Sequence, residues 1–184
     1  TPALPPNNII VGQQNYVNGD ANQVNGSVNT LVGSWNAVQG SANLLVGNQN
    51  AITGNYNAVG GDLNAIGGTA NYVTGSVNGV LGNQNTLLGN YNVVSGNTNV
   101  LAGNYNAVSG STNQIAGSAN VVDGSKNILI GNTNGVWGSA NFLQGDANLV
   151  KGDLNGIVGS ANQVQGTYNA LAGNTNVVSG SANT

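Results

Sequence analysis

The chain lacks several residue types altogether: its 184 residues include no cysteine, methionine, histidine, arginine or glutamate. Without cysteine there can be no disulfides and no thiolate ligands or nucleophiles. A Ser-His-Asp triad, a Cys-His pair, a zinc site of the usual ligands and a pair of catalytic glutamates are all excluded for the same reason. We therefore expect a protein without enzymatic activity, with no catalytic residues, no metal site and no cofactor.

Charge is scarce as well. Charged side chains make up 4% of the residues, and two lysines and five aspartates give a formal net charge of -3. A nucleic-acid partner requires clustered cationic side chains, so we exclude one. The sequence contains no apolar run of about 18 residues, and we expect no membrane span. The chain opens with threonine and has no basic and apolar leader, which predicts a processed, secreted protein that acts extracellularly.

What the sequence does contain is one heptad unit, repeated without an insertion or deletion. Glycine recurs at every seventh position from Gly12 to Gly180, and an asparagine follows at the third position after each glycine. A valine, isoleucine or leucine lies at the second position after each of these asparagines up to Asn176. A coiled coil is excluded, because it needs two apolar positions per heptad and each helical glycine costs about 1 kcal/mol relative to alanine.

Within the unit, side chains alternate with the period of two that is typical of β-strands. The glycine and the small polar residue after it are turn formers that tolerate positive φ. Five-residue strands joined by two-residue corners predict an all-β fold, a β-solenoid. Because a flattened coil needs two strands, we expect a two-sheeted parallel β-roll with about 14 residues per coil and roughly 13 coils. A three-sided coil of about 21 residues is the alternative.

Two columns of residues are predicted to point inward. The aliphatic column, from Ile10 and Val17 onward, forms the core, and the asparagine column lies beside the corners. A lone buried amide is costly, whereas stacked asparagines can hydrogen-bond along the axis as a ladder. The predicted ladder includes Asn15, Asn22, Asn29, Asn36, Asn43, Asn50, Asn57 and Asn64. Residues 8–184 then form a single repeat β-solenoid domain, preceded by a proline-rich arm or light cap at residues 1–7.

The repeat resembles the Asn-x-Val-x-Gly heptad of the perennial-ryegrass type of plant ice-binding protein, as in Asn57–Gly61 and Asn106–Gly110. The resemblance extends from Asn8 to Asn183. It implies a β-roll with paired asparagine ladders and a valine core. It also implies antifreeze activity, or inhibition of ice recrystallisation, through one flat face.

The remaining positions, which are the second, fourth and sixth after each glycine, are predicted to point outward and to carry the function. They are unusually apolar, include bulky aromatic residues, and place threonine in no straight column, whereas an ice-binding face is expected to be flat and regular. The predicted interaction face includes Thr30, Leu44, Tyr72, Thr86, Thr98, Val100, Ile128, Phe142, Trp35, Tyr91, Tyr105 and Trp137.

These outward residues favour a structural or surface protein that self-associates. Uncapped solenoid ends expose unpaired backbone groups, and head-to-tail contacts between copies build filaments. The first hypothesis is therefore a homo-oligomer or filament formed through the ends and the apolar outer faces. The alternative is an ice-binding protein, with ice as the partner of one flat face. An adhesive or glycan-binding stalk is a third possibility, because exposed aromatic rings can stack on sugars.

Overall fold

The computed structural model describes residues 7–184, so the predicted arm at residues 1–7 lies outside the described residues except for Asn7. The described chain contains 25 strands of three residues each and no helix. It forms two compact units, the first ending at Tyr91 and the second spanning Asn92–Thr184. We call these unit 1 and unit 2 and describe each by itself. The single domain expected at residues 8–184 stays a prediction.

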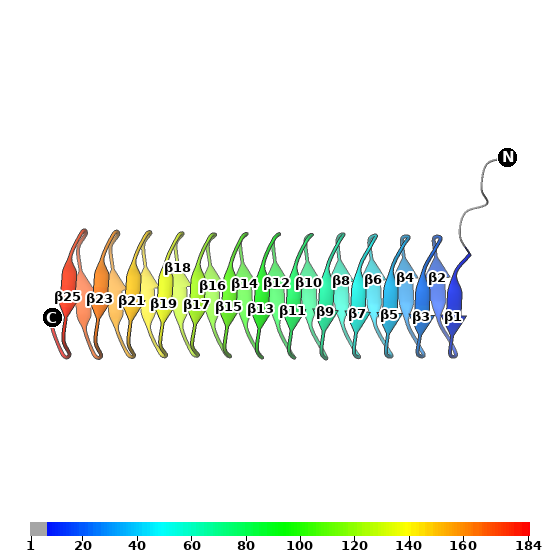
Figure 1. Cartoon of the computed structure of the whole chain (residues 1–184), viewed down its shortest axis with the longest axis horizontal. Helices are drawn as coiled ribbons and strands as arrows, with labels where there is room; N and C mark the ends of the chain where they lie inside the picture. The colour runs from blue at the N-terminus through cyan, green and yellow to red at the C-terminus, as the bar shows by residue number, and fades with distance from the viewer. Residues whose placement is uncertain (1–6) are drawn as a thin grey trace. The chain divides into compact units, whose positions relative to one another are not determined.

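Unit 1 consists of two parallel sheets of six strands. Sheet A holds β1 (Ile9–Val11), β3 (Gln23–Asn25), β5 (Ala37–Gln39), β7 (Ala51–Thr53), β9 (Ala65–Gly67) and β11 (Gly79–Leu81). Sheet B holds β2 (Tyr16–Asn18), β4 (Thr30–Val32), β6 (Leu44–Val46), β8 (Ala58–Gly60), β10 (Tyr72–Thr74) and β12 (Thr86–Leu88). Within each sheet the strands pair in this order, as Figure 1 shows for the unit drawn from blue to green.

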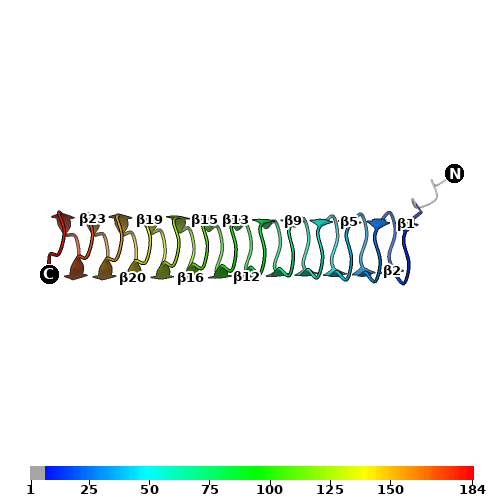
Figure 2. The same cartoon turned by 90° about the horizontal axis from the view of Figure 1, so that it is seen from below.

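Unit 2 repeats this arrangement. Its sheet A holds β13 (Val93–Ser95), β15 (Ala107–Ser109), β17 (Val121–Asp123), β19 (Gly135–Trp137), β21 (Leu149–Lys151), β23 (Gln163–Gln165) and β25 (Val177–Ser179). Its sheet B holds β14 (Val100–Ala102), β16 (Gln114–Ala116), β18 (Ile128–Ile130), β20 (Phe142–Gln144), β22 (Gly156–Val158) and β24 (Ala170–Ala172). The two sheets of each unit face each other as two layers (Figure 2).

The predicted β-roll is confirmed. Within each unit, strands pair in register with the next strand but one along the chain, as Ile9 of β1 does with Gln23 of β3. One coil therefore contains two strands and two heptads, and the three-sided alternative is wrong. The strands are shorter than the five-residue strands expected, and the corners are correspondingly longer. Each corner extends from the glycine to the asparagine, because the chain needs two backbone positions with positive φ to turn.

The middle residue of each strand forms the core. Branched aliphatic side chains favour strands, where they pack well on a pleated surface. The column is at most 3% exposed from Val24 to Leu87 in unit 1 and from Val94 to Val164 in unit 2. Ile10 was predicted in this column but is 45% exposed, because it lies in the first strand of the described chain. Burial of each such side chain stabilises the fold by about 1.5–3 kcal/mol before the entropic cost.

Candidate functional site

The predicted asparagine ladder is confirmed, and it runs along the inside of both corners. Asn57 shows its geometry: Nδ2 donates to Oδ1 of Asn43 at 3.1 Å and to the carbonyl oxygen of Gly68 at 2.9 Å. Its own Oδ1 accepts from the backbone N–H and from Nδ2 of Asn71, both at 3.0 Å. All buried side-chain nitrogen and oxygen atoms of residues 7–184 have a hydrogen-bond partner. This explains why neither serine nor aspartate replaces asparagine, since neither supplies both a strong acceptor and two N–H donors.

A second ladder, which the sequence did not predict, runs along the outside of the corners. In this ladder the side-chain oxygen of the residue after a corner glycine accepts a hydrogen bond from a backbone N–H. The donor is the equivalent residue of the preceding coil. Ser41 N–H donates to Oδ1 of Asn55 at 2.8 Å, and Ser27 N–H donates to Oγ of Ser41 at 3.2 Å. In the inner ladder the backbone N–H belongs instead to the later coil, so the two ladders run in opposite directions.

The outer ladder explains the position of four of the five aspartates. Asp62 accepts from the backbone N–H of Asn48 at 2.7 Å, and Asp146 and Asp153 accept equivalent bonds from Asn132 and Ser139. Asp20 takes part through its backbone N–H, which donates to Oγ of Ser34 at 3.0 Å. Serine, asparagine, aspartate, threonine and glutamine share this position, and each carries a side-chain oxygen. That shared oxygen was the signal in the sequence from which the ladder could have been predicted.

The corners also hold several residues that were predicted on the outward faces. The third corner residue has positive φ at all corners of the described chain, for example 62° at Val28 and 64° at Trp35. The second corner residue was expected to share positive φ with the glycine, and this expectation was wrong. A left-handed conformation costs roughly 1–2 kcal/mol for a residue other than glycine. A backbone hydrogen bond offsets part of this cost, as from Val28 N–H to the carbonyl of Gln13 at 3.0 Å.

Four of the twelve predicted interaction residues lie in these corners and not on the sheets: Trp35, Thr98, Tyr91 and Tyr105. Seven others occupy the first outward position of a sheet B strand: Thr30, Leu44, Tyr72 and Thr86 in unit 1, and Val100, Ile128 and Phe142 in unit 2. Thr30 pairs in register with Leu44, Tyr72 with Thr86, and Ile128 with Phe142. Trp137 lies on sheet A of unit 2.

In unit 2 the two sheets differ in charge. None of the outward strand positions of sheet B, in either unit of the described chain, carries a charged side chain. On sheet A, unit 1 is also free of charge at the strand positions described, whereas unit 2 presents Asp123 and Lys151. Sheet B is covered by exposed or half-buried apolar and hydroxyl side chains, among them Val32, Leu44, Val46, Val100 and Ile130, with the amides of Asn18, Gln114 and Gln144 between them. It therefore offers an uncharged, periodically repeating surface in each unit.

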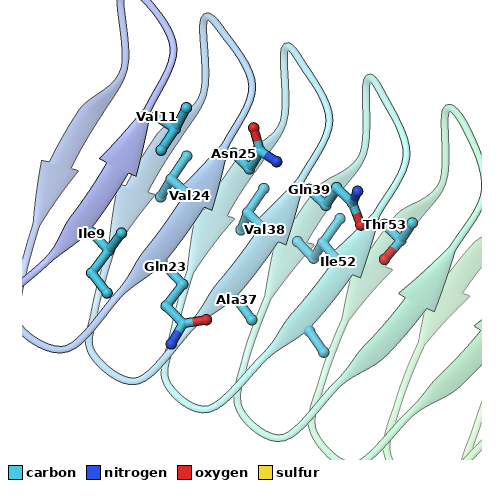
Figure 3. A pocket seen from close by; sticks show the side chains of 11 residues that line it. Ile9, Val11, Gln23, Val24, Asn25, Ala37, Val38, Gln39, Ile52 and Thr53 are labelled. Atoms are coloured by element: carbon cyan, nitrogen blue, oxygen red, sulfur yellow. The ribbon is translucent and has the colours of Figure 1, made fainter.

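A shallow trough of about 410 Å³ lies on sheet A of unit 1 (Figure 3). Its two rims are rows of outward side chains, Ile9, Gln23, Ala37 and Ala51 on one side and Val11, Asn25, Gln39 and Thr53 on the other. The strand centres at Val24, Val38 and Ile52 lie between these rows. The lining includes no titratable group, and its polar side chains are those of Gln23, Asn25, Gln39 and Thr53.

Residues 7–184 contain no group of three or more histidine, cysteine, aspartate or glutamate side chains that could hold a metal ion. Within the same residues, no helix has the length and the apolar character needed to cross a membrane.

Three overlapping stretches of the chain, residues 5–82, 65–138 and 119–184, match the profile of the grass antifreeze beta roll. Together they cover almost the whole sequence. No curated protein matches the chain significantly.

Proposed function

Because the chain belongs to the grass antifreeze β-roll family, we propose that it binds ice and that sheet B of each unit is the ice-binding surface. The observation that carries this assignment is the contrast within unit 2, where the outward strand positions of sheet B are uncharged and those of sheet A include Asp123 and Lys151. Unit 1 repeats the same arrangement of strands, and we assign its sheet B by analogy. We further propose that the protein is not an enzyme and acts outside the cell. The family supports both of these statements.

Charge matters because ions hold their hydration water strongly. A carboxylate or an ammonium group orients the adjacent water around itself, and this water cannot also take its place in a crystal lattice. Apolar and hydroxyl side chains leave the first water layer free to order. On sheet B these side chains repeat from strand to strand at about 4.8 Å, the spacing of hydrogen-bonded strands.

In each unit the longest run of sheet B strands without an aromatic side chain contains three strands. In unit 1 the strands β4, β6 and β8 present threonine, valine, leucine, alanine and glycine, and the next strand carries Tyr72. In unit 2 the strands β14, β16 and β18 present valine, alanine, glutamine and isoleucine, and the next strand carries Phe142. We propose these two three-strand runs as the regions in contact with ice. The dispersed threonines noted in the sequence are then a minor part of a mainly aliphatic surface.

The test places one charge on each sheet of the same unit. Val100→Asp adds a carboxylate to sheet B, and Val93→Asp adds one at the same strand position of sheet A. Both valines are exposed, at 47% and 60%. We expect Val100→Asp to lower the inhibition of ice recrystallisation at a fixed protein concentration by about half, because the run in unit 1 is left intact, and Val93→Asp to leave it nearly unchanged.

Circular dichroism of the two variants controls for folding. If Val93→Asp removed the activity and Val100→Asp did not, sheet A would be the ice-binding surface. If the wild-type protein failed to inhibit recrystallisation at any concentration, the proposed function itself would be wrong.

Self-association is a second candidate, favoured by the exposed apolar side chains of sheet B. Monomeric proteins rarely expose contiguous apolar patches larger than a few hundred Å². Contact between two copies through these faces predicts a sedimentation coefficient that rises with protein concentration, and a lower coefficient for Val100→Asp. A sedimentation coefficient that stays constant across the concentration series would exclude self-association. Filaments seen by electron microscopy would show that the copies assemble beyond a pair.

A further inference from the structure

Sheet A of unit 2 carries an exposed tryptophan, Trp137, which belongs neither to the core nor to the uncharged surface of sheet B. Four consecutive strands of this sheet, β17, β19, β21 and β23, place Asp123, Trp137, Lys151 and Gln165 side by side in register. Trp137 thus lies between a carboxylate on one strand and an ammonium group on the next. All four residues occupy the last position of their strand and point outward.

The indole ring lies over its own strand. A Cβ atom placed on Gly135 would lie 2.7 Å from Cζ3 and 3.0 Å from Cη2 of Trp137, which puts the six-membered ring directly above that glycine. Gly135 does not have the positive φ of the corner glycines, so its backbone does not require glycine. The missing side chain instead provides the space in which the ring rests on the sheet. Trp137 nevertheless remains 40% exposed.

The ring has both charged and apolar neighbours. Nζ of Lys151 lies over the ring, 6.0 Å from its centroid, and Asp123 is the register neighbour of Trp137 on the preceding strand. Leu149 borders the space above Gly135, because a Cβ atom placed on that glycine would lie 3.1 Å from its Cδ1. The strand β23 adds the side-chain amides of Gln163 and Gln165, which are both exposed. One carboxylate and one ammonium group give the cluster no net charge. It offers hydrogen-bond donors and acceptors around an apolar platform.

We propose that this platform binds a neutral pyranose unit of a polysaccharide. The C–H face of a sugar ring is apolar and packs on an indole, while its hydroxyls need both donors and acceptors around the ring. A uronic acid would meet the carboxylate of Asp123 as well as the ammonium group. A nucleobase could also stack, but its phosphates need clustered cations, and Lys151 is the one cation on the outward positions of this sheet in the described chain.

The test uses the full chain and the fluorescence of Trp137. The protein contains two tryptophans, so Trp35→Phe leaves Trp137 as the sole indole reporter. Cellohexaose, laminarihexaose and xylohexaose are titrated into this variant, and isothermal titration calorimetry repeats the measurement on the wild-type protein. We expect saturable quenching or a spectral shift with at least one of the three sugars.

Three variants then locate the site by calorimetry. Trp137→Ala should weaken the binding at least about tenfold, the effect of removing roughly 1.4 kcal/mol of interaction. Gly135→Ala should weaken it too, because the new methyl group displaces the ring without straining the backbone. Trp35→Ala, which removes an exposed corner tryptophan, should leave the affinity unchanged.

Two outcomes would overturn the proposal: no saturable binding of any of the three sugars, or equal losses for Trp137→Ala and Trp35→Ala. The site lies on the opposite sheet of unit 2 from the proposed ice-binding surface. Trp137→Ala is therefore expected to leave the inhibition of ice recrystallisation intact. Failure of the sugar-binding proposal would not affect the ice-binding proposal, and the reverse also holds.

Discussion

Replacing Gly61 with alanine is expected to destabilise unit 1 by roughly 4 kcal/mol, from backbone strain and overpacking together. Gly61 has a φ of 119°, a region that L-residues with a side chain rarely adopt. An added Cβ would also overlap the carbonyl oxygen of Gly75 in the next coil. Because this oxygen belongs to the backbone, the overlap can be relieved only by separating two coils.

The adjacent glycine is a matched control. Gly60 is the last residue of β8, and a Cβ placed on it would have no atom within 4 Å. Gly60→Ala should leave the stability unchanged or raise it by about 0.5–1 kcal/mol, because alanine loses less conformational entropy than glycine in a strand. The midpoint of thermal unfolding, followed by circular dichroism, measures both variants. Equal midpoints for the two would contradict the packing argument.

Replacing Asn57 with alanine is expected to cost a similar amount, roughly 4 kcal/mol. The substitution removes four side-chain hydrogen bonds, two donated by Nδ2 and two accepted by Oδ1. The carbonyl of Gly68 and the backbone N–H of Asn71 lose these partners inside the solenoid. Each buried polar group left without a partner costs about 1–3 kcal/mol.

Urea unfolding measures the overall loss of stability, and hydrogen exchange tests its cause. The amide of Asn71 should exchange much faster in Asn57→Ala than in the wild-type protein, since its acceptor is gone. Asn55→Ala is the control: Asn55 is exposed and accepts one bond from Ser41, which water can replace. Its cost should not exceed about 1 kcal/mol. Equal unfolding midpoints for Asn57→Ala and Asn55→Ala would show that the inner ladder contributes little to stability.

The period of the repeat was enough to predict the scaffold. A glycine, an asparagine and a branched aliphatic residue at fixed spacing allow one strand geometry, and the pairing of Ile9 with Gln23 follows from two heptads per coil. The asparagine ladder was also predictable, because an invariant amide next to a core position needs a partner of its own kind. The scarcity of charge at the outward positions could be read directly, but only the structure placed Lys126 in a corner and so left the outward strand positions of sheet B uncharged.

The corners could not be predicted in the same way. Tyrosine, valine, lysine and tryptophan at the third corner position give no local indication of a left-handed backbone, and valine disfavours it. The positive φ at Trp35 arises because the corner backbone must hydrogen-bond to the preceding coil, as Trp35 N–H does to the carbonyl of Asp20 at 3.0 Å. Alternation of side chains therefore stops at the strand ends, and Thr98 leaves the face on which it was predicted.

By itself, then, the sequence determined the fold class, the core and the inner ladder, since all three follow from residues repeated at one spacing. Only the tertiary structure decided between two and three strands per coil, the length of the corners, the opposite direction of the outer ladder and the position of each aromatic ring. These depend on contacts between coils, and the same heptad position can carry tyrosine, alanine or threonine without breaking the repeat. The ring of Trp137 rests on the sheet because Gly135 leaves space beneath it, a contact within one strand that the period does not encode.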